Sequence, residues 1–279
     1  MSNRPSQEYP SLPKSYKGMF PFKIATTSFI YPDDYIPNVK MLGPCMDEIE
    51  LLLFESKGPD SLPSRTVISE LERLAAEFEL SYNVHLPTDI SISDRSADRQ
   101  AAALETMARV IDRVNPLDPS ALILHVPYNE NSLDDHAAGK WQERVHQNLQ
   151  KIVSTAGNRD IIAIENLDYP LELLEDIIVD LNLSICLDLG HLMVYDYDVL
   201  TVFNKYADKA PILHVHGVEN VCDHTTLERL SDKLSTTVHR VLKKFTGVVS
   251  IEVFSFEHLD SSLKYLEGLW RKSENGCLV

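Results

Sequence analysis

Short apolar runs alternate with longer amphipathic stretches along almost the whole chain, and this alternation limits the possible folds more than any other feature. Eight runs are rich in β-branched and aliphatic residues, as buried strands are. They cover residues 22–29, 48–56, 80–87, 121–127, 160–167, 183–190, 211–218 and 247–255. Helical periodicity marks the segments 65–79, 97–114, 140–156, 171–181, 226–245 and 258–272, and more weakly 196–209. The link at 32–38 (PDDYIPN) is the least helical, and we expect a loop there.

The alternation of strand and helix is typical of parallel βαβ units. Eight such units in about 260 residues match the size of a (β/α)8 TIM barrel. An open doubly wound sheet is the alternative, but no glycine-rich phosphate-binding motif follows the first run. The 279 residues include only ten glycines, and none of them form such a motif. We therefore expect an α/β fold, with one TIM-barrel catalytic domain over residues 21–275.

Residues 1–20 differ in composition from the rest of the chain. They are rich in proline, serine and charged side chains, so we expect a flexible N-terminal arm. They contain no apolar core of a secretory signal, and no segment approaches the roughly 18 consecutive apolar residues of a membrane helix. The four cysteines form no Cys-x-x-Cys pair, so a zinc ribbon is not expected. These features predict a cytoplasmic protein with no membrane partner.

Side chains of a strand point alternately to its two faces, and we applied this rule to the six runs from residue 80 onward. One face is entirely aliphatic and is expected to pack against the helices. The other face carries polar residues near the C-terminal end of each run, where the active sites of TIM barrels lie. These inward residues are His85, His125, Glu165, Asp188, His214 and Glu252. His216 shares the inward face with His214.

Three imidazoles and three carboxylates would therefore share one interior, and no lysine or arginine occupies these inward positions. Buried carboxylates without partners are costly. A single strand histidine is more often a hydrogen-bonded core residue than a ligand, but six successive strands each contribute a polar residue at the same depth. Imidazole and carboxylate are common ligands of zinc, manganese, iron and cobalt. The pattern predicts a divalent metal centre inside the barrel.

Six motifs, NVHLP, LHVP, IENL, LDLGH, LHVHG and IEV, follow one another between residues 83 and 253, within a resemblance that covers about 22–270. In this order they resemble the xylose isomerase-like superfamily. This superfamily includes the endonuclease IV-type apurinic endonucleases (AP endonuclease family 2) and many sugar isomerases and epimerases. The resemblance to the endonuclease branch implies two divalent metal ions, with zinc the most expected. It places the first ion on His85, His125 and a bridging Glu165, and the second on Glu165, Asp188, His214 and Glu252.

The same resemblance implies a third metal ion, held by His191 and by an Asp-x-His sequence in the loop after the seventh run. Here the loop histidine is His224, and Cys222 stands where the pattern has aspartate. Asp223 is adjacent but at the wrong spacing. Whether Cys222 or Asp223 completes a third site stays open.

Within the superfamily, the chain resembles the cobamide-remodelling phosphodiesterases most. The similar stretches are FPFKIATTSFIYPDDYIPNV (20–39), DEIELLLFES (47–56), IAIENLDYP (162–170), LDLGHLM (187–193) and IEVFS (251–255). The resemblance implies hydrolysis of the nucleotide-loop phosphodiester of corrinoids such as adenosylcobalamin. The products would be cobinamide phosphate and the α-riboside of the lower base, released during cobamide salvage. The implied partner is thus a small corrinoid substrate.

Catalytic roles are expected for Glu165, Glu252 and His216. His216 would contact the phosphate or assist proton transfer, or else orient a metal ligand. Tyr31, which follows the first run, would contact a flat ring of the substrate or simply pack in its loop. Asn166 would orient a ligand or shape a turn. The remaining histidines, His136, His146, His239 and His258, are expected at the surface.

Other functions remain possible within this fold. A sugar isomerase or epimerase needs Glu165, Asp188, His214 and Glu252 around one metal, with the two glutamates as acid and base. His85 and His125 favour the phosphodiesterase, because a one-metal epimerase does not require them. The net charge of −16, from 26 basic and 42 acidic residues, argues against an apurinic endonuclease, since DNA binding depends on basic side chains. A degenerate barrel that only binds would be expected to lack some ligands.

Overall fold

The structure is a computed structural model and describes residues 9–53, 62–157, 161–219 and 222–274. Eight parallel strands close into a barrel, in the order β1-β10-β7-β6-β5-β4-β3-β2. The strands are β1 Lys23–Thr27, β2 Glu48–Leu52, β3 Ser81–His85, β4 Leu122–Leu124, β5 Ile162–Glu165, β6 Ser184–Asp188, β7 Ile212–Val215 and β10 Val248–Ile251. This confirms the predicted TIM barrel.

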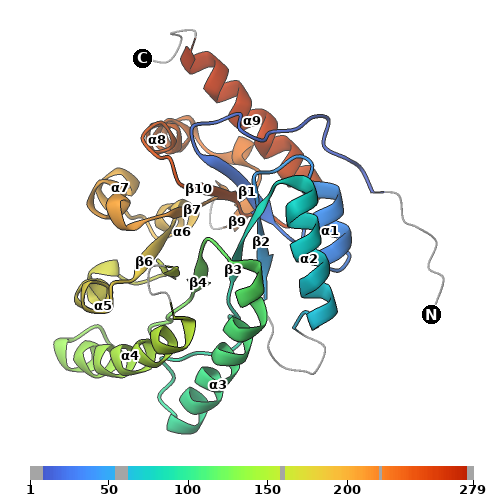
Figure 1. Cartoon of the computed structure of the whole chain (residues 1–279). Helices are drawn as coiled ribbons and strands as arrows, with labels where there is room; N and C mark the ends of the chain where they lie inside the picture. Colours follow the sequence, from blue (N-terminus) through green and yellow to red (C-terminus); the bar gives the residue numbers. More distant parts are fainter. Residues whose placement is uncertain (1–8, 54–61, 158–160, 220–221, 275–279) are drawn as a thin grey trace.

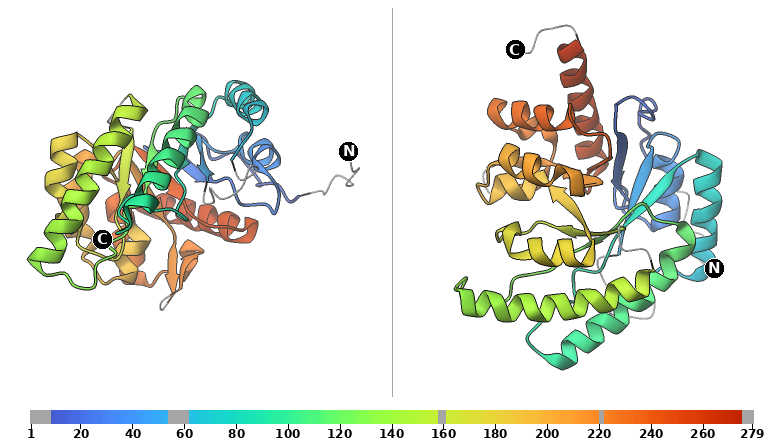
Figure 2. Two further views of the ribbon diagram at one scale, coloured as in Figure 1. Left: turned by 90° about the horizontal axis from the view of Figure 1, so that it is seen from below. Right: turned by 60° about the vertical axis from the view of Figure 1, so that its left-hand side comes forward.

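Helices surround the barrel on its outside (Figure 1). They are α1 Tyr35–Leu42, α2 Arg65–Phe78, α3 Ala97–Val114, α4 Asp135–Ala156, α5 Glu175–Leu181, α6 Leu189–Val194, α7 Val199–Tyr206, α8 Asp232–Leu242 and α9 Phe256–Glu274. Short 3₁₀ turns are η1 Asn115–Leu117, η2 Leu171–Leu174, η3 Ala207–Lys209 and η4 Leu227–Arg229. The long helices α3 and α4 lie side by side (Figure 2). No helix in the described parts of the chain is long and apolar enough to cross a membrane.

An antiparallel hairpin interrupts the alternation after β7. Its strands are β8 Gly217–Glu219 and β9 Cys222–Thr225. The hairpin, coloured orange, lies at the lower edge of the left-hand view in Figure 2. Because it follows the C-terminal end of a barrel strand, it belongs to the face on which TIM barrels carry their active sites.

The barrel interior has two chemically different layers. Small and apolar side chains fill one layer: Ala25, Ala121, Ile123, Ala163, Cys186, Ile212 and Val248. The aliphatic face predicted to point outward, with Val84 and Leu124 among its members, packs in the larger cluster between strands and helices. Polar side chains remain for the interior at the C-terminal ends of the strands. An apolar base therefore supports a polar chamber.

The link predicted as a loop at 32–38 contains the start of helix α1, so that prediction was wrong from Tyr35 onward. Pro37 had argued for a loop, yet it lies in the first turn of the helix, where a backbone N–H has no intrahelical partner. Buried Asn38 then holds the turn before the helix. Its Oδ1 accepts from the Tyr31 backbone N–H at 2.8 Å, and its Nδ2 donates to the Tyr31 carbonyl at 3.1 Å.

The expected flexible arm was also wrong for its described part, residues 9–20. Leu12, Tyr16 and Phe20 are buried against the barrel. The Tyr16 backbone N–H donates to the Cys45 carbonyl at 2.9 Å. The Phe20 ring meets the ring of Trp270 from α9 edge to face, with 5.6 Å between centroids. These few apolar residues, spaced among prolines and charges, tie the segment to the domain, whereas residues 1–8 lie outside the description.

Candidate metal centre and active site

The predicted inward residues meet at the C-terminal end of the barrel. His85, Glu165 and Asp188 are the last residues of β3, β5 and β6. His125 and Glu252 follow directly after β4 and β10. All five except His125 are almost completely buried, and the His125 side chain is 24% exposed. The strands alone therefore position these side chains, and one of them reaches solvent.

The first group of ligands consists of His85, His125 and Glu165. The Nε2 atoms of His85 and His125 lie 3.1 and 2.9 Å from the same oxygen, Oε2 of Glu165. The other nitrogen of His85, Nδ1, donates to the Leu86 carbonyl at 3.0 Å. This bond turns Nε2 toward the cluster, which is the orientation a metal-ligating histidine needs.

The second group consists of Glu165, Asp188, His214 and Glu252, whose candidate ligand atoms all lie within 4.8 Å of one another. His214 Nδ1 is 3.0 Å from Glu252 Oε2 and 3.7 Å from Glu165 Oε1. Three buried atoms of this group, Asp188 Oδ2, His214 Nδ1 and Glu252 Oε2, make no hydrogen bond of acceptable geometry within the described chain. Buried polar atoms without partners are costly, and a cation bound among them would satisfy all three. The donor set therefore fits a divalent metal ion.

Glu165 links the two groups. Its Oε2 atom faces His85 and His125, whereas its Oε1 atom faces His191 at 3.3 Å and His214 at 3.7 Å. A carboxylate whose two oxygens face two different ligand sets has the arrangement of a bridging ligand. The bridging role that the resemblance implied for Glu165 stays a prediction, which this geometry permits.

Glu50 belongs to this centre, and the sequence analysis missed it. It is a fully buried residue of β2, and its Oε2 lies 3.1 Å from Nε2 of His214. Nδ1 of His214 faces the second ligand group, so Glu50 contacts the opposite edge of the same ring. The alternation rule was applied only from residue 80 onward, which left out the pair Glu48 and Glu50 in DEIELLLFES. Applied to this run, it would have placed both glutamates inside the barrel.

Glu48 and Glu50 have different environments. Glu48 accepts hydrogen bonds from Ser81 Oγ at 2.6 Å and Asn83 Nδ2 at 2.9 Å, so its charge is satisfied by neighbouring strands. Both carboxylate oxygens of Glu50, in contrast, lack a hydrogen bond of acceptable geometry within the described residues. Glu50 therefore depends on His214 for a partner, whereas Glu48 is a structural residue.

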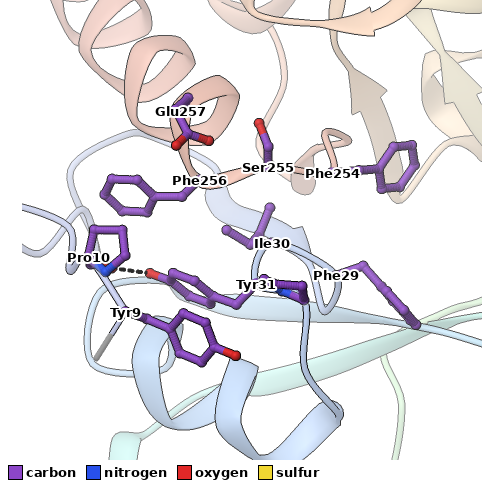
Figure 3. A pocket seen from close by; sticks show the side chains of 10 residues that line it. Tyr9, Pro10, Phe29, Ile30, Tyr31, Phe254, Ser255, Phe256 and Glu257 are labelled. Atoms are coloured by element: carbon purple, nitrogen blue, oxygen red, sulfur yellow. Dashed lines mark hydrogen bonds between the residues drawn. The ribbon is translucent and has the colours of Figure 1, made fainter. Parts of the chain in front are cut away.

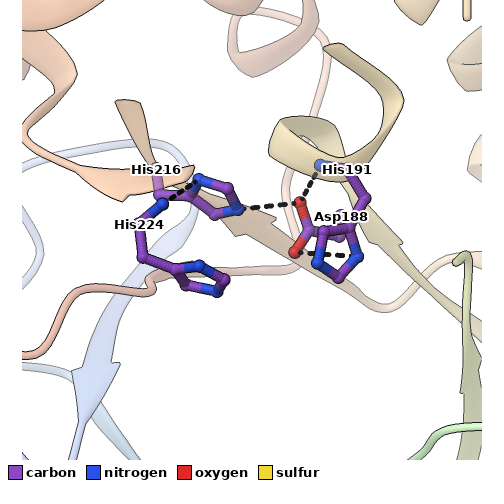
Figure 4. A group of neighbouring side chains, drawn as sticks. All are labelled: Asp188, His191, His216 and His224. Carbon is purple, nitrogen blue, oxygen red and sulfur yellow. Dashed lines mark hydrogen bonds and ion pairs between the residues drawn. The ribbon is translucent and has the colours of Figure 1, made fainter. Parts of the chain in front are cut away.

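A third cluster contains Asp188, His191, His216 and His224 (Figure 4). The His224 backbone N–H donates to His216 Nδ1 at 2.9 Å, which is shorter than the 3.3 Å from this nitrogen to the Gly217 carbonyl, so we assign Nδ1 as an acceptor. Nε2 of a neutral His216 then carries the proton, and it lies 3.2 Å from Asp188 Oδ1. His216 is fully buried and touches a ligand rather than the cleft. The geometry favours the orienting role over a contact between His216 and phosphate.

The loop residues Cys222 and Asp223 do not enter this cluster. Cys222 is exposed, and Asp223 Oδ1 contacts Nδ1 of His224 at 3.1 Å from outside the cluster. His224 itself has a backbone φ of 51°, in the left-handed region that few non-glycine residues adopt. This conformation lets the hairpin direct the His224 ring onto His216, with 4.2 Å between the two stacked rings.

Gly190 of the LDLGH motif allows the ring of His216 to approach α6. A Cβ atom at this position would lie 1.9 Å from the imidazole, far inside van der Waals contact. Asp188 caps the same helix, because its Oδ1 accepts from the His191 backbone N–H at 2.8 Å. The motif therefore supplies a ligand, a helix cap and the space for His216.

Asn166 holds the backbone of Asp188 and is not among the residues that line the cleft above Glu165. Its Oδ1 accepts from the Asp188 backbone N–H at 2.8 Å, and its Nδ2 donates to the Asp188 carbonyl at 3.0 Å. The Asn166 carbonyl accepts from His191 Nδ1 at 3.1 Å, which leaves Nε2 of His191 for a cation or a phosphate. Tyr31 is buried, and its hydroxyl donates to the Pro10 carbonyl at 2.7 Å.

Of the histidines expected at the surface, one was placed wrongly. His239 is buried on α8, where its ring meets Trp270 edge to face at 5.7 Å. The basic sequence HRVLKKF suggested an exposed helix face, but only Arg240, Lys243 and Lys244 are exposed there. Helical periodicity turns His239 to the apolar side with Val238 and Leu242.

The charged groups of the centre shift one another's pKa. Burial opposes ionisation of Glu165, but His125 and His214 hold the pKa of its carboxyl well below the usual value. Burial likewise opposes the charged form of His85, and its bond to Glu165 outweighs this and raises its pKa. At His224, the contact with Glu252 overcomes burial and raises the pKa to about 9. In the metal-free protein, the shifts at His85 and His224 favour the protonated imidazole beside the buried carboxylates.

Comparison with solved structures shows the same fold in sugar epimerases and endonucleases. A D-tagatose 3-epimerase-like protein superposes with a TM-score of 0.74 at 19% identity, covering 91% of this chain and 99% of the other. Endonuclease IV from Thermus thermophilus gives a TM-score of 0.69 at 16% identity, covering 90% and 99%. An AP endonuclease of family 2 from Brucella melitensis gives 0.68 at 15% identity, covering 88% and 98%.

No curated protein matches the sequence of this chain. The family model described as "Xylose isomerase-like TIM barrel" matches residues 39–272, which is most of the sequence. This match spans the strands β2 to β10 and every residue of the three ligand clusters. The chain therefore belongs to the xylose isomerase-like TIM-barrel family, to which AP endonuclease family 2 also belongs.

Proposed function

We propose that the protein is a metal-dependent phosphodiesterase that hydrolyses the nucleotide-loop phosphodiester of cobamides such as adenosylcobalamin. The observation that carries the proposal is the position of Glu165 between two ligand groups. Its Oε2 faces His85 and His125, and its Oε1 faces the group of Asp188, His214 and Glu252. Two adjacent cation sites suit the in-line displacement of a phosphodiester.

Two divalent ions, zinc in the first instance, would stabilise the attacking and leaving oxygens and lower the pKa of water. The protein's own residues hold and orient the phosphate. His191 and His224 line the open cleft above Glu165, a cavity of about 590 Å³. Both histidines have raised pKa values, although burial opposes this, because carboxylates surround them. The imidazole N–H groups at this position can donate hydrogen bonds to phosphate oxygens.

The proton for the leaving group can come from His224. Its Nε2 lies 3.5 Å from Glu252 Oε2, and its side chain is partly exposed to the cleft. Glu252 thus holds the proton-bearing edge of the imidazole near the ligand cluster. In this proposal, Glu165, Glu252 and the proton donor His224 are catalytic residues, while His216 and Asn166 position Asp188.

The substrate class is proposed from the charge of the molecule together with its motifs. A net charge of −16 disfavours the extended phosphate backbone of DNA. A corrinoid presents a single phosphodiester, which the metal centre can bind without a basic surface. The products would be cobinamide phosphate and the α-riboside of the lower base.

The experiment is metal analysis followed by incubation with adenosylcobalamin and mass spectrometry of the products. We expect about two divalent ions per chain and release of cobinamide phosphate. His125→Ala should abolish hydrolysis with an unchanged circular dichroism spectrum, because His125 is a partly exposed ligand. His146→Ala, on α4 and paired with Asp180 at 2.7 Å, is the matched control and should remain active. Wild-type hydrolysis by His125→Ala would contradict the first ligand group.

A sugar isomerase or epimerase is the second candidate. The group of Glu165, Asp188, His214 and Glu252 converges on one place and includes two glutamates that could serve as acid and base. The similar epimerase structures show that the fold accommodates such proteins. Turnover of free ketoses without any hydrolysis of phosphodiesters would favour this candidate and reject the first.

A further inference from the structure

A second cavity lies at the same end of the barrel, and Figure 3 shows the residues that line it. It lies between the loop after β1 and the loop after β10, and its volume is about 630 Å³. Cavities that bind small molecules usually measure about 300–1,000 Å³. Its lining comes from residues 29–32, residues 254–257, and Tyr9 and Pro10 of the N-terminal segment.

Five of the ten residues that line the cavity are aromatic. The Tyr31 ring lies between Tyr9, at 4.9 Å between centroids, and Phe256, at 5.9 Å with the two planes 25° apart. Phe29 and Phe254, at the other end of the cavity, are 45% and 42% exposed. Large aromatic side chains this exposed are typical of a binding surface for a flat apolar group.

Phe254 connects the cavity with the metal centre. It lines both this cavity and the cleft above His125 and Glu165. Its ring also stacks on His224, with 5.1 Å between centroids and 29° between planes. A ligand with its phosphodiester on the metal ligands can therefore place a neighbouring ring between Phe254 and Phe29.

The charge of the cavity separates the two halves of such a ligand. Among the described residues that line the cavity, Glu257 is the single charged one, and none is a lysine or arginine. The phosphate has no cationic partner there and is better bound at the metal centre. An uncharged aromatic ring, in contrast, is suited to the cavity.

The walls are held in place by the fold. Asn38 fixes the backbone of Tyr31 through both its amide oxygen and its amide nitrogen. The Tyr31 hydroxyl donates to the Pro10 carbonyl, and the Tyr9 hydroxyl donates to Asp33 Oδ2 at 3.0 Å. Preformed walls reduce the entropy that binding would otherwise cost.

We propose that this cavity binds the aromatic heterocycle carried on one side of the scissile phosphodiester. Resting on the proposed function, this heterocycle is the lower base of the cobamide, a benzimidazole attached through its ribose. The corrin ring then lies on the opposite side of the phosphate. The N-terminal segment contributes Tyr9 and Pro10 to the subsite.

The test measures binding of α-ribazole, the riboside of dimethylbenzimidazole, to the metal-free protein by calorimetry. Without metal ions, binding reports on the ring and not on catalysis. We expect Phe29→Ala and Phe254→Ala each to weaken binding by about tenfold, the usual effect of removing one stacking ring. Binding of ribose 5-phosphate, which has no ring to stack, should be the same in the wild type and both variants.

The matched control is Tyr195→Ala, which removes an aromatic side chain that is 47% exposed but does not line the cavity. This variant should bind α-ribazole as the wild type does. An equal loss in all three variants, or no loss in either phenylalanine variant, would overturn the subsite.

Different results would contradict the aromatic subsite and the cobamide phosphodiesterase function. If adenosylcobalamin is hydrolysed but Phe29→Ala leaves α-ribazole binding and KM unchanged, the subsite is wrong and the phosphodiesterase stands. If α-ribazole binding depends on Phe29 but no cobamide is hydrolysed, the aromatic subsite stands and the cobamide function is wrong.

Discussion

At the scale of single residues, the centre depends on side chains that contact the candidate ligands on the edge that faces away from the ligand group. Glu50 is the clearest case, because it contacts Nε2 of His214 while Nδ1 of the same ring faces the second ligand group. A carboxylate in this place fixes the tautomer and orientation of a ligating histidine. The network therefore extends one residue beyond each candidate ligand.

We predict that Glu50→Ala weakens binding of the second metal ion by about 10–100-fold, because His214 loses the partner that orients its ring. Titration against a competing chelator measures this. Glu48→Gln is the matched control, since it alters a neighbouring buried glutamate of the same strand that contacts Ser81 and Asn83. The control should change thermal stability and leave metal affinity as it is. Equal metal affinity in Glu50→Ala and wild type would refute the positioning role.

Gly190 gives a second prediction at this scale. Gly190→Ala brings a methyl group into the space of the His216 ring and should destabilise the protein by about 1–3 kcal/mol. Urea unfolding measures the change. Gly139→Ala is the control, because Gly139 is exposed in α4 with no atom within 4 Å of the added Cβ. It should stabilise the protein by about 0.5–1 kcal/mol, as expected for alanine in a helix. A neutral effect of Gly190→Ala would mean that the His216 ring moves freely.

At the scale of elements, the sequence predicted strands better than helix starts. The outer face of each barrel strand packs against helices and is therefore apolar. The other face of each strand, from Val84 to Val253, then carries the side chains that point inward. Helix α1 was not predicted from the sequence, because it has only eight residues and contains Pro37, which is tolerated in the first turn of a helix. The packing of residues 9–20 on the barrel was not predicted either. It comes from contacts with residues distant in the sequence, such as Trp270, which local composition does not reveal.

The candidate site also contains both kinds of residue: those that strand alternation predicts and those that tertiary contacts place. Alternation within strands located His85, Glu165 and Asp188, since their direction is fixed by the backbone alone. Alternation could not predict the position of His224 or its backbone hydrogen bond to His216. Both depend on the hairpin after β7 and on the left-handed backbone of His224. Glu50 differs from these residues, because alternation within its strand is enough to place it, with Glu48, inside the barrel.

Helix α8 supplies a prediction about pH. Burial, together with nearby Lys243, lowers the pKa of His239 below its ordinary value near 6.5. The unfolded chain then binds a proton at this residue more readily than the folded one, so stability falls as the pH drops below about 6.5. We expect the loss of melting temperature between pH 7.5 and 5.5, in metal-free protein, to be smaller in His239→Gln than in wild type. Identical slopes would show that His239 does not contribute.

At the scale of the whole molecule, the centre concentrates negative charge in the interior of the fold. Four buried carboxylates, Glu50, Glu165, Asp188 and Glu252, surround one space at the end of the barrel. Their partners are imidazoles, which lose their proton where they ligate a metal. Cation binding should therefore couple to the stability of the entire barrel.

We predict that a chelator lowers the melting temperature of the protein by about 5–10 °C relative to protein with zinc at 100 times its dissociation constant. Differential scanning fluorimetry measures the shift. Glu165→Gln should respond much less to zinc, because it removes the carboxylate shared by both ligand groups. A full zinc response in Glu165→Gln would contradict the shared position of this residue.

Asp188 has a consequence for which ion the centre accepts. Asn166 holds its backbone, the first turn of α6 and His216 hold its Oδ1, and its Oδ2 remains for a cation. A carboxylate restrained by so many contacts cannot shift to accommodate a larger ion. Calcium requires oxygen ligands at about 2.3–2.6 Å and a large, adaptable coordination shell. We therefore expect selection by ionic radius, with zinc, manganese or iron bound and calcium excluded because the carboxylate cannot move away from it.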